Sequence, residues 1–126
     1  MLFCTAVNCM DGRVQLPVNR CLREHFAAEY VDTVTEAGPV GILSADPESP
    51  ASRSIYDRID ISVTAHLSTA LAIVAHANCA GNPISDSDQQ HQVESCVVHL
   101  RRRYPDLEIA GLWLDEEWTV HLFGAP

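Results

Sequence analysis

Residues 2–13 read LFCTAVNCMDGR, a short apolar run that leads directly into a cluster of reactive side chains. A run of this length with few polar breaks predicts a strand buried on both faces of a sheet. A second such run, LAIVA at residues 71–75, leads into HANC at residues 76–79. The two stretches therefore predict two buried strands, each followed by side chains that can bind a metal.

Cys9, His76 and Cys79 form a ligand set that suits zinc. Zinc binds thiolate sulfur and imidazole nitrogen in tetrahedral geometry, whereas magnesium and calcium prefer oxygen ligands. Three protein ligands leave the fourth position open, which is typical of a catalytic zinc rather than a structural one. Ligands in open α/β sheets bind beyond the carboxyl ends of the strands, so these side chains converge if the two strands are neighbours.

Asp11 and Arg13 follow Cys9 closely and have two possible arrangements. Asp11 can ligate the metal as its fourth ligand and close the site, or it can turn away and accept a hydrogen bond from metal-bound water. Arg13 can hold the carboxylate in the second state through a charge-assisted pair. The sequence alone leaves both arrangements open.

Helical and extended patterns alternate along the rest of the chain. Apolar residues every fourth position predict a helix over residues 16–30 with Pro17 in its first turn, and residues 31–37 predict a strand. The Gly- and Pro-rich stretch 38–50 is interpreted as an irregular, mobile loop. Helices are expected over residues 54–66 and 83–104, the second capped by Ser85 or Asp86. Residues 109–114 and 119–123 predict a closing hairpin, packed by Trp113 and Trp118.

Strands that alternate with helices predict an α/β fold in three layers, with a mainly parallel central sheet and a C-terminal antiparallel hairpin strand. The chain has 126 residues, enough for one core, so residues 1–126 are expected to form a single domain. Its composition, 47% hydrophobic and 20% charged, is ordinary for a globular protein.

Charge and cysteine content exclude several classes of function. A net charge of −9 argues against a nucleic-acid partner, because binding to phosphates depends on Lys and Arg. No apolar stretch reaches the roughly 18 residues needed to span a bilayer, and the N-terminus lacks the basic start of a signal peptide. An odd cysteine count fits no complete disulfide framework. We therefore expect a cytoplasmic protein with no membrane partner.

The motifs resemble those of the β-class carbonic anhydrases. The resemblance rests on Cys-x-Asp-x-Arg after a first strand and His-x-x-Cys-x-Gly after a later one, here residues 9–13 and 76–81. It implies Zn²⁺ bound by Cys9, His76 and Cys79, with Asp11 and Arg13 as the catalytic pair. It also implies that zinc-bound hydroxide reversibly hydrates CO₂ to bicarbonate, and that the chain forms homodimers or larger homo-oligomers.

The chain departs from the family pattern at several places. Family members usually carry Arg-Asn-Ala-Gly-Asn or a close variant after the second strand, where this chain has Thr-Glu-Ala-Gly-Pro at residues 35–39. The chain also starts at the first strand, without the N-terminal helices that many members use to embrace a partner. Such a divergent member has two further possible functions: hydrolysis of carbonyl sulfide or carbon disulfide on the same zinc, or non-catalytic zinc binding with the site closed by Asp11.

Overall fold

The computed structural model describes residues 2–123 and contains a five-stranded sheet in the order β2-β1-β3-β4-β5. Strands β1, β2, β3 and β4 pair in parallel, and β5 pairs antiparallel with β4. The predicted fold class is confirmed, and the first and third strands are neighbours, which is the condition under which their terminal side chains converge. The strand bounds are β1 Phe3–Cys9, β2 Tyr30–Glu36, β3 Ala70–His76, β4 Glu108–Leu114 and β5 Val120–Phe123.

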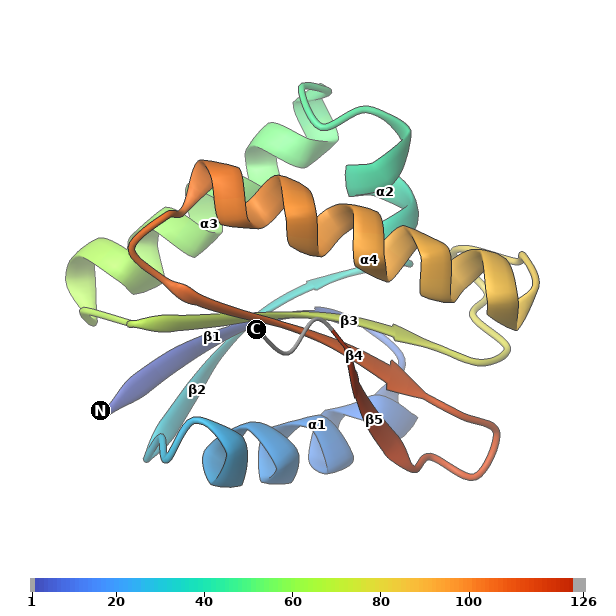
Figure 1. The fold of residues 1–126 in the computed structure, drawn as a ribbon, viewed down its shortest axis with the longest axis horizontal. Helices are drawn as coiled ribbons and strands as arrows, with labels where there is room; N and C mark the ends of the chain where they lie inside the picture. Colours follow the sequence, from blue (N-terminus) through green and yellow to red (C-terminus); the bar gives the residue numbers. More distant parts are fainter. Residues whose placement is uncertain (1, 124–126) are drawn as a thin grey trace.

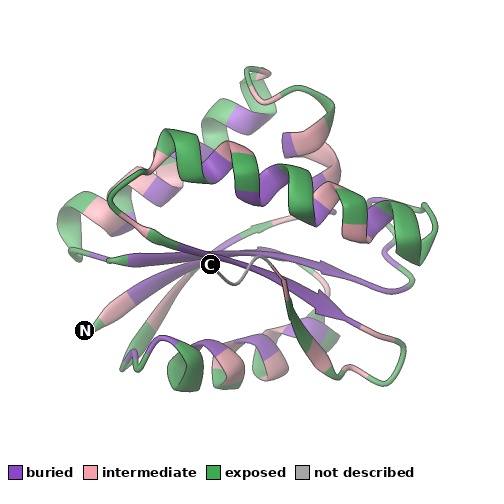
Figure 2. Cartoon of the chain, in the orientation of Figure 1, coloured by how far each residue is buried: buried purple, intermediate pink, exposed green. Residues whose placement is uncertain are grey.

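Helices cover both faces of the sheet (Figure 1). Helix α1 lies on one face, and the other three lie together on the opposite face. The central strands between them are buried, β3 along its entire length (Figure 2). This explains why its sequence is a continuous apolar run without alternation. The helix bounds are α1 Gly12–His25, α2 Pro39–Ala45, α3 Pro50–Ala65 and α4 Asp86–Arg103.

Helix α1 begins four residues before the predicted start at residue 16 and ends at His25 rather than at residue 30. Asp11 caps it, because its side chain accepts a hydrogen bond from the backbone N–H of Arg13. Pro17 therefore lies inside the helix and not in its first turn. The prediction was wrong at the start because it followed the apolar spacing, whereas the cap at Asp11 starts the helix at Gly12.

The stretch 38–50 is not an irregular loop, as the sequence suggested, because it contains helix α2. Pro39 occupies the start of this helix, where a missing N–H removes no helical hydrogen bond. Gly38 precedes it in a left-handed conformation, with φ at 71°. Gly38 and Pro39, which contributed to the loop prediction, are thus the residues at which the helix starts.

The remaining elements lie close to their predicted positions. Helix α3 starts at Pro50, four residues early, because Ser49 caps it by accepting from the N–H of Ser52. Ser85, one of the two proposed caps, accepts from the N–H of Asp88 at the start of α4. The predicted C-terminal hairpin is confirmed by the antiparallel pairing of β4 with β5.

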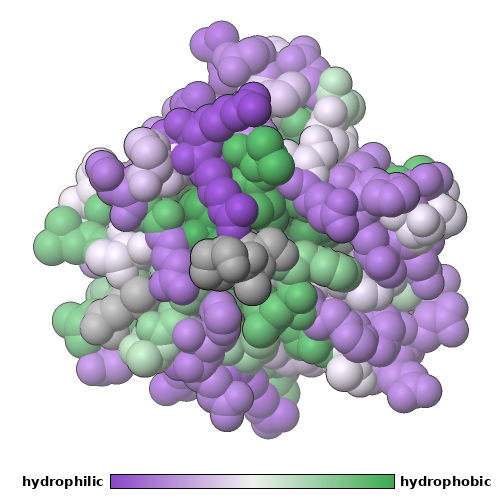
Figure 3. Space-filling model, in the orientation of Figure 1, coloured by the Kyte–Doolittle hydropathy of each residue, from purple (hydrophilic) through white to green (hydrophobic). Residues whose placement is uncertain are grey.

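Hydrophilic and apolar side chains both reach the surface. On the face shown in Figure 3, apolar side chains gather toward the middle and hydrophilic side chains surround them. None of the helices in the described part of the chain combines the length and the apolar character that a membrane crossing requires.

Candidate metal centre

The ends of β1 and β3 bring Cys9, His76 and Cys79 together. The two strands pair in parallel with Val7 opposite Ile73, so their carboxyl ends lie side by side. The ligand atoms of the three residues all lie within 4.8 Å of one another, and all three residues are buried. Cys9 and His76 are the last residues of β1 and β3, and Cys79 lies in the turn that follows β3.

A tight turn after β3 places Cys79 beside His76. The backbone N–H of Ala77 donates to the Leu114 carbonyl at 2.9 Å, which anchors the start of the turn to β4. Asn78 then adopts a left-handed conformation with φ at 55°, which asparagine tolerates better than most residues. The turn brings the Cys79 sulfur to 3.8 Å from the Cys9 sulfur.

The imidazole of His76 is oriented as a metal ligand would be. Its Nδ1 donates to the Ala77 carbonyl at 2.7 Å, which leaves Nε2 as the nitrogen with a free electron pair. Nε2 is buried and has no hydrogen-bond partner. A buried polar atom without a partner is unfavourable, so Nε2 is prepared for a ligand that accepts its electron pair.

The spacing of the sulfurs fits a tetrahedral metal. Two sulfurs bound to zinc at about 2.3 Å and at the tetrahedral angle are about 3.8 Å apart. The Cys9 and Cys79 sulfurs are separated by 3.8 Å. Together with the free Nε2 of His76, this donor set suits zinc.

The two thiols differ in acidity. Burial raises the pKa of Cys9, but the nearby His76 side chain and backbone N–H groups at Asp11 and Gly38 outweigh it and lower the pKa to about 7. Burial and the nearby charge of Cys9 raise the pKa of Cys79. Cys9 is therefore the thiol that more readily becomes a thiolate near neutral pH, and the thiolate is the form that binds a metal.

Asp11 and Arg13 form a bidentate pair at the edge of this site. Arg13 Nε donates to Asp11 Oδ1 at 3.1 Å, and Arg13 Nη2 donates to Asp11 Oδ2 at 2.8 Å. These bonds hold the pKa of Asp11 at about 2, so the carboxylate is ionised at neutral pH. Asp11 Oδ2 also lies 4.0 Å from His76 Nε2. The structure thus shows Asp11 bound to Arg13 while it faces the ligand cluster.

Two further residues at the site were not predicted as part of it. Gln89, on α4, is buried and donates to the carbonyls of His76 at 3.0 Å and Asn82 at 3.3 Å. A glutamine four residues before Val93 on an apolar helix face was a signal that could have found it. Trp118, expected only to pack the hairpin, lies over Arg13 with 4.5 Å between the guanidinium carbon and the ring centre.

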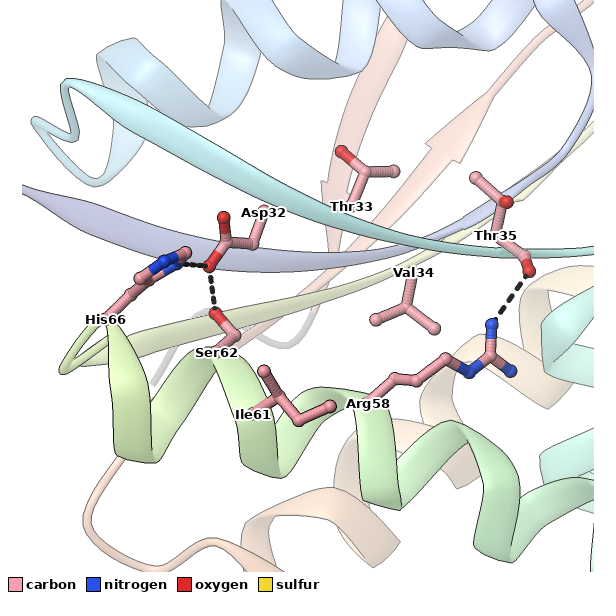
Figure 4. Close-up of a pocket in the computed structure, with 8 residues that line it drawn as sticks. All are labelled: Asp32, Thr33, Val34, Thr35, Arg58, Ile61, Ser62 and His66. Carbon is pink, nitrogen blue, oxygen red and sulfur yellow. Dashed lines mark hydrogen bonds and ion pairs between the residues drawn. The ribbon is translucent and has the colours of Figure 1, made fainter.

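Glu36, which differs from the family pattern, has a basic partner. It pairs in register with Cys9 on the neighbouring strand, and Arg58 of α3 forms an ion pair with its carboxylate. Arg58 also donates to the carbonyl of Thr35 (Figure 4). The negative charge of Glu36 is therefore balanced by Arg58 of α3.

A groove of about 350 Å³ lies between β2 and α3. Arg58 lies at one end of it, and Asp32, Ser62 and His66 point toward one another at the other end (Figure 4). None of the predicted site residues lines this groove.

The comparisons with known proteins agree with this arrangement. Residues 1–124 match the family described as "putative carbonic anhydrase". The chain belongs to this family. The expected resemblance to carbonic anhydrases is therefore confirmed. A search of curated proteins found no match to the chain.

Solved structures of β-carbonic anhydrases share the fold. One of two tetrameric β-carbonic anhydrases from the filamentous ascomycete Sordaria macrospora has a TM-score of 0.64 at 13% identity, covering 96% of this chain and 80% of that one. The carbonic anhydrase from Streptococcus mutans has a TM-score of 0.61 at 13% identity, covering 95% and 81%. The β-carbonic anhydrase CcaA has a TM-score of 0.61 at 11% identity, covering 97% and 80%. At such low identity these likenesses concern the fold alone.

Proposed function

We propose that this member of the carbonic anhydrase family binds Zn²⁺ through Cys9, His76 and Cys79 and reversibly hydrates CO₂ to bicarbonate. One observation carries the proposal: the three ligand atoms lie within 4.8 Å of one another, beside an ionised carboxylate that Arg13 holds. Family membership supports the same chemistry.

The residues of the proposed site would have distinct roles. Cys9, His76 and Cys79 hold the metal, and Gln89 fixes the backbone on which His76 lies. When bound, zinc lowers the pKa of a water molecule in the open fourth position and so supplies a nucleophile near neutral pH. Asp11 is ionised and can only accept hydrogen bonds, so it would orient the O–H of that water. Arg13 keeps Asp11 available for this role.

The contacts of Asp11 favour an open site over a closed one. Its carboxylate accepts three hydrogen bonds from Arg13, two from the side chain and one from the backbone N–H. Moving Asp11 onto the metal would break the side-chain bonds and remove the cap of α1. Charge-assisted bonds of this kind are about twice as strong as neutral ones. This supports a catalytic site rather than a purely structural one.

The experiment is stopped-flow CO₂ hydration by the zinc-loaded protein across pH 7–9. We expect turnover that falls at least about tenfold in Asp11→Ala and in Arg13→Ala, since positioned proton acceptors contribute 10²–10⁴-fold. Arg20→Ala, an exposed arginine on the same helix, is the matched control and should keep its activity. Zinc binding without CO₂ turnover would reject the proposal. Carbonyl sulfide and carbon disulfide, assayed in parallel, would then identify a hydrolase or, if neither reacts, a non-catalytic zinc protein.

We also propose that the chain forms a homodimer or a larger homo-oligomer. The proposal is supported by family membership and by the tetrameric state of the relatives from Sordaria macrospora. Multi-angle light scattering of the purified protein tests it. A monomer at micromolar concentration would contradict it.

A further inference from the structure

The tip of the β4–β5 hairpin places Trp118 against the catalytic pair. The guanidinium carbon of Arg13 lies 4.5 Å from the centre of the Trp118 ring. The imidazole of His76 lies 5.9 Å from the same ring, tilted by 45°. One side chain from the C-terminal hairpin thus contacts a proposed metal ligand and the residue that holds Asp11.

Trp118 occupies a backbone conformation that disfavours it. Its φ is 64°, in the left-handed region where glycine is preferred and a bulky side chain is strained. The tip is held by Asp115, whose carbonyl accepts from the N–H of Trp118 at 3.0 Å and whose side chain accepts from the N–H groups of Glu117 and Thr119. Glycine would fit this tip better, so the geometry of the turn does not explain why a tryptophan occupies this position.

We propose that Trp118 is a positioning residue for the Asp11–Arg13 pair, an inference that rests on the proposed function. A guanidinium over an indole face is attracted by the negative face of the ring. The same guanidinium donates to Asp11 through Nε and Nη2. Trp118 thereby restricts Arg13 to the orientation in which both of these N–H groups meet the carboxylate, and this keeps Asp11 off the metal.

The test uses protein loaded with cobalt(II), which reports its coordination by visible absorption, and azide as the probe of the fourth position. Trp118→Gly removes the ring and leaves the residue that the tip conformation favours, so the hairpin should be retained. From the usual strength of a cation–π contact we expect azide to bind about three- to tenfold more weakly in Trp118→Gly. Trp118→Phe keeps an aromatic face and should restore most of the affinity.

A double-mutant cycle separates positioning from a merely structural role. If Trp118 acts through Arg13, adding Trp118→Gly to Arg13→Ala causes no further loss of azide affinity. The matched control is Trp113→Phe, because Trp113 is buried in β4 on the opposite face of the sheet and should alter stability without altering azide affinity. Additive losses, or an unchanged affinity in Trp118→Gly, would overturn the inference.

A metal-free measurement distinguishes failure of this inference from failure of the proposed function. In a Trp113→Phe background Trp118 is the remaining tryptophan, and Arg13→Ala should shift its fluorescence emission while Arg20→Ala should not. Azide binding without CO₂ hydration would reject the proposed function and leave the role of Trp118 intact. If Arg13→Ala leaves the emission of Trp118 unchanged, the role of Trp118 is rejected, whatever the CO₂ hydration activity.

Discussion

Gly81 packs directly against Ala37. A Cβ atom on Gly81 would lie 2.6 Å from the Ala37 carbonyl oxygen and 2.8 Å from the Ala37 Cβ, closer than side chains approach one another. Ala37 follows β2 and Gly81 follows β3, and these strands flank β1 in the sheet. The two loops therefore meet across the carboxyl end of β1, where Cys9 lies, and the glycine of the His-x-x-Cys-x-Gly motif is required by this contact.

Gly81→Ala should therefore damage both stability and metal binding. Overpacking typically costs about 1–3 kcal/mol, and here the clash involves backbone that cannot move aside easily. The matched control is Gly12→Ala in the first turn of α1, where an added Cβ meets nothing within 4 Å. Urea denaturation should show a loss for Gly81→Ala and a change of less than about 1 kcal/mol for Gly12→Ala. Equal effects of the two changes would contradict the close packing.

Zinc content should depend on Cys9, His76 and Cys79 and not on the other cysteines. Elemental analysis of the purified protein is expected to give one zinc per chain, and Cys79→Ala should lose it, because two ligands rarely hold zinc in competition with water. Cys96→Ala is the control, since Cys96 is a buried residue of α4 and belongs to the other side of the sheet. A Cys79→Ala protein with full zinc content would refute the ligand set.

The strands and the clustering of Cys9, His76 and Cys79 could be predicted from the sequence because both depend on local pattern. The continuous apolar runs of β1 and β3 are typical of strands that are buried on both faces. Reactive side chains at the carboxyl ends of such strands converge when the strands pair. Helix α2 was missed because Gly38 and Pro39 can end one element or start the next, and only packing decides. The contact of Trp118 with Arg13 was beyond prediction, since it depends on how far the hairpin tip reaches across α1.

Thiol reactivity should separate Cys9 from the structural cysteines in metal-free protein. The pKa of Cys9 is lowered to about 7, whereas burial raises that of Cys4 to about 11 and that of Cys96 to about 12. At pH 8 Cys9 is therefore mostly thiolate, and the thiolate is the form that reacts. Peptide mapping after a short iodoacetamide pulse should find Cys9 modified first. One equivalent of zinc should abolish that modification, and modification that continues unchanged with zinc would contradict metal binding by Cys9.

Ser62 should be important for stability. Its hydroxyl lies 2.7 Å from the hydroxyls of Thr5 and Ser68 and donates to the Asp32 carboxylate at 2.7 Å (Figure 4). Ser62→Ala leaves buried hydroxyls without this partner, which should lower the free energy of unfolding by about 1–3 kcal/mol. Thr64→Ala, an exposed hydroxyl on the same helix, should change it by less than about 0.5 kcal/mol. Indistinguishable urea midpoints for the two variants would contradict the role of this cluster.

The ion pair between Glu36 and Arg58 should contribute to stability because it is only partly exposed. The side chains are 29% and 38% exposed, against 66% and 68% for Glu48 and Arg53, a pair whose arginine lies on the same helix as Arg58. Arg58→Ala should therefore lower the free energy of unfolding by about 0.5–1 kcal/mol, and Arg53→Ala by less. Because the lost interaction is electrostatic, the difference should shrink at 1 M salt. Adding Glu36→Gln to Arg58→Ala should recover part of the loss by removing the unpaired charge, and a further loss in that double variant would show that Glu36 is held by other contacts.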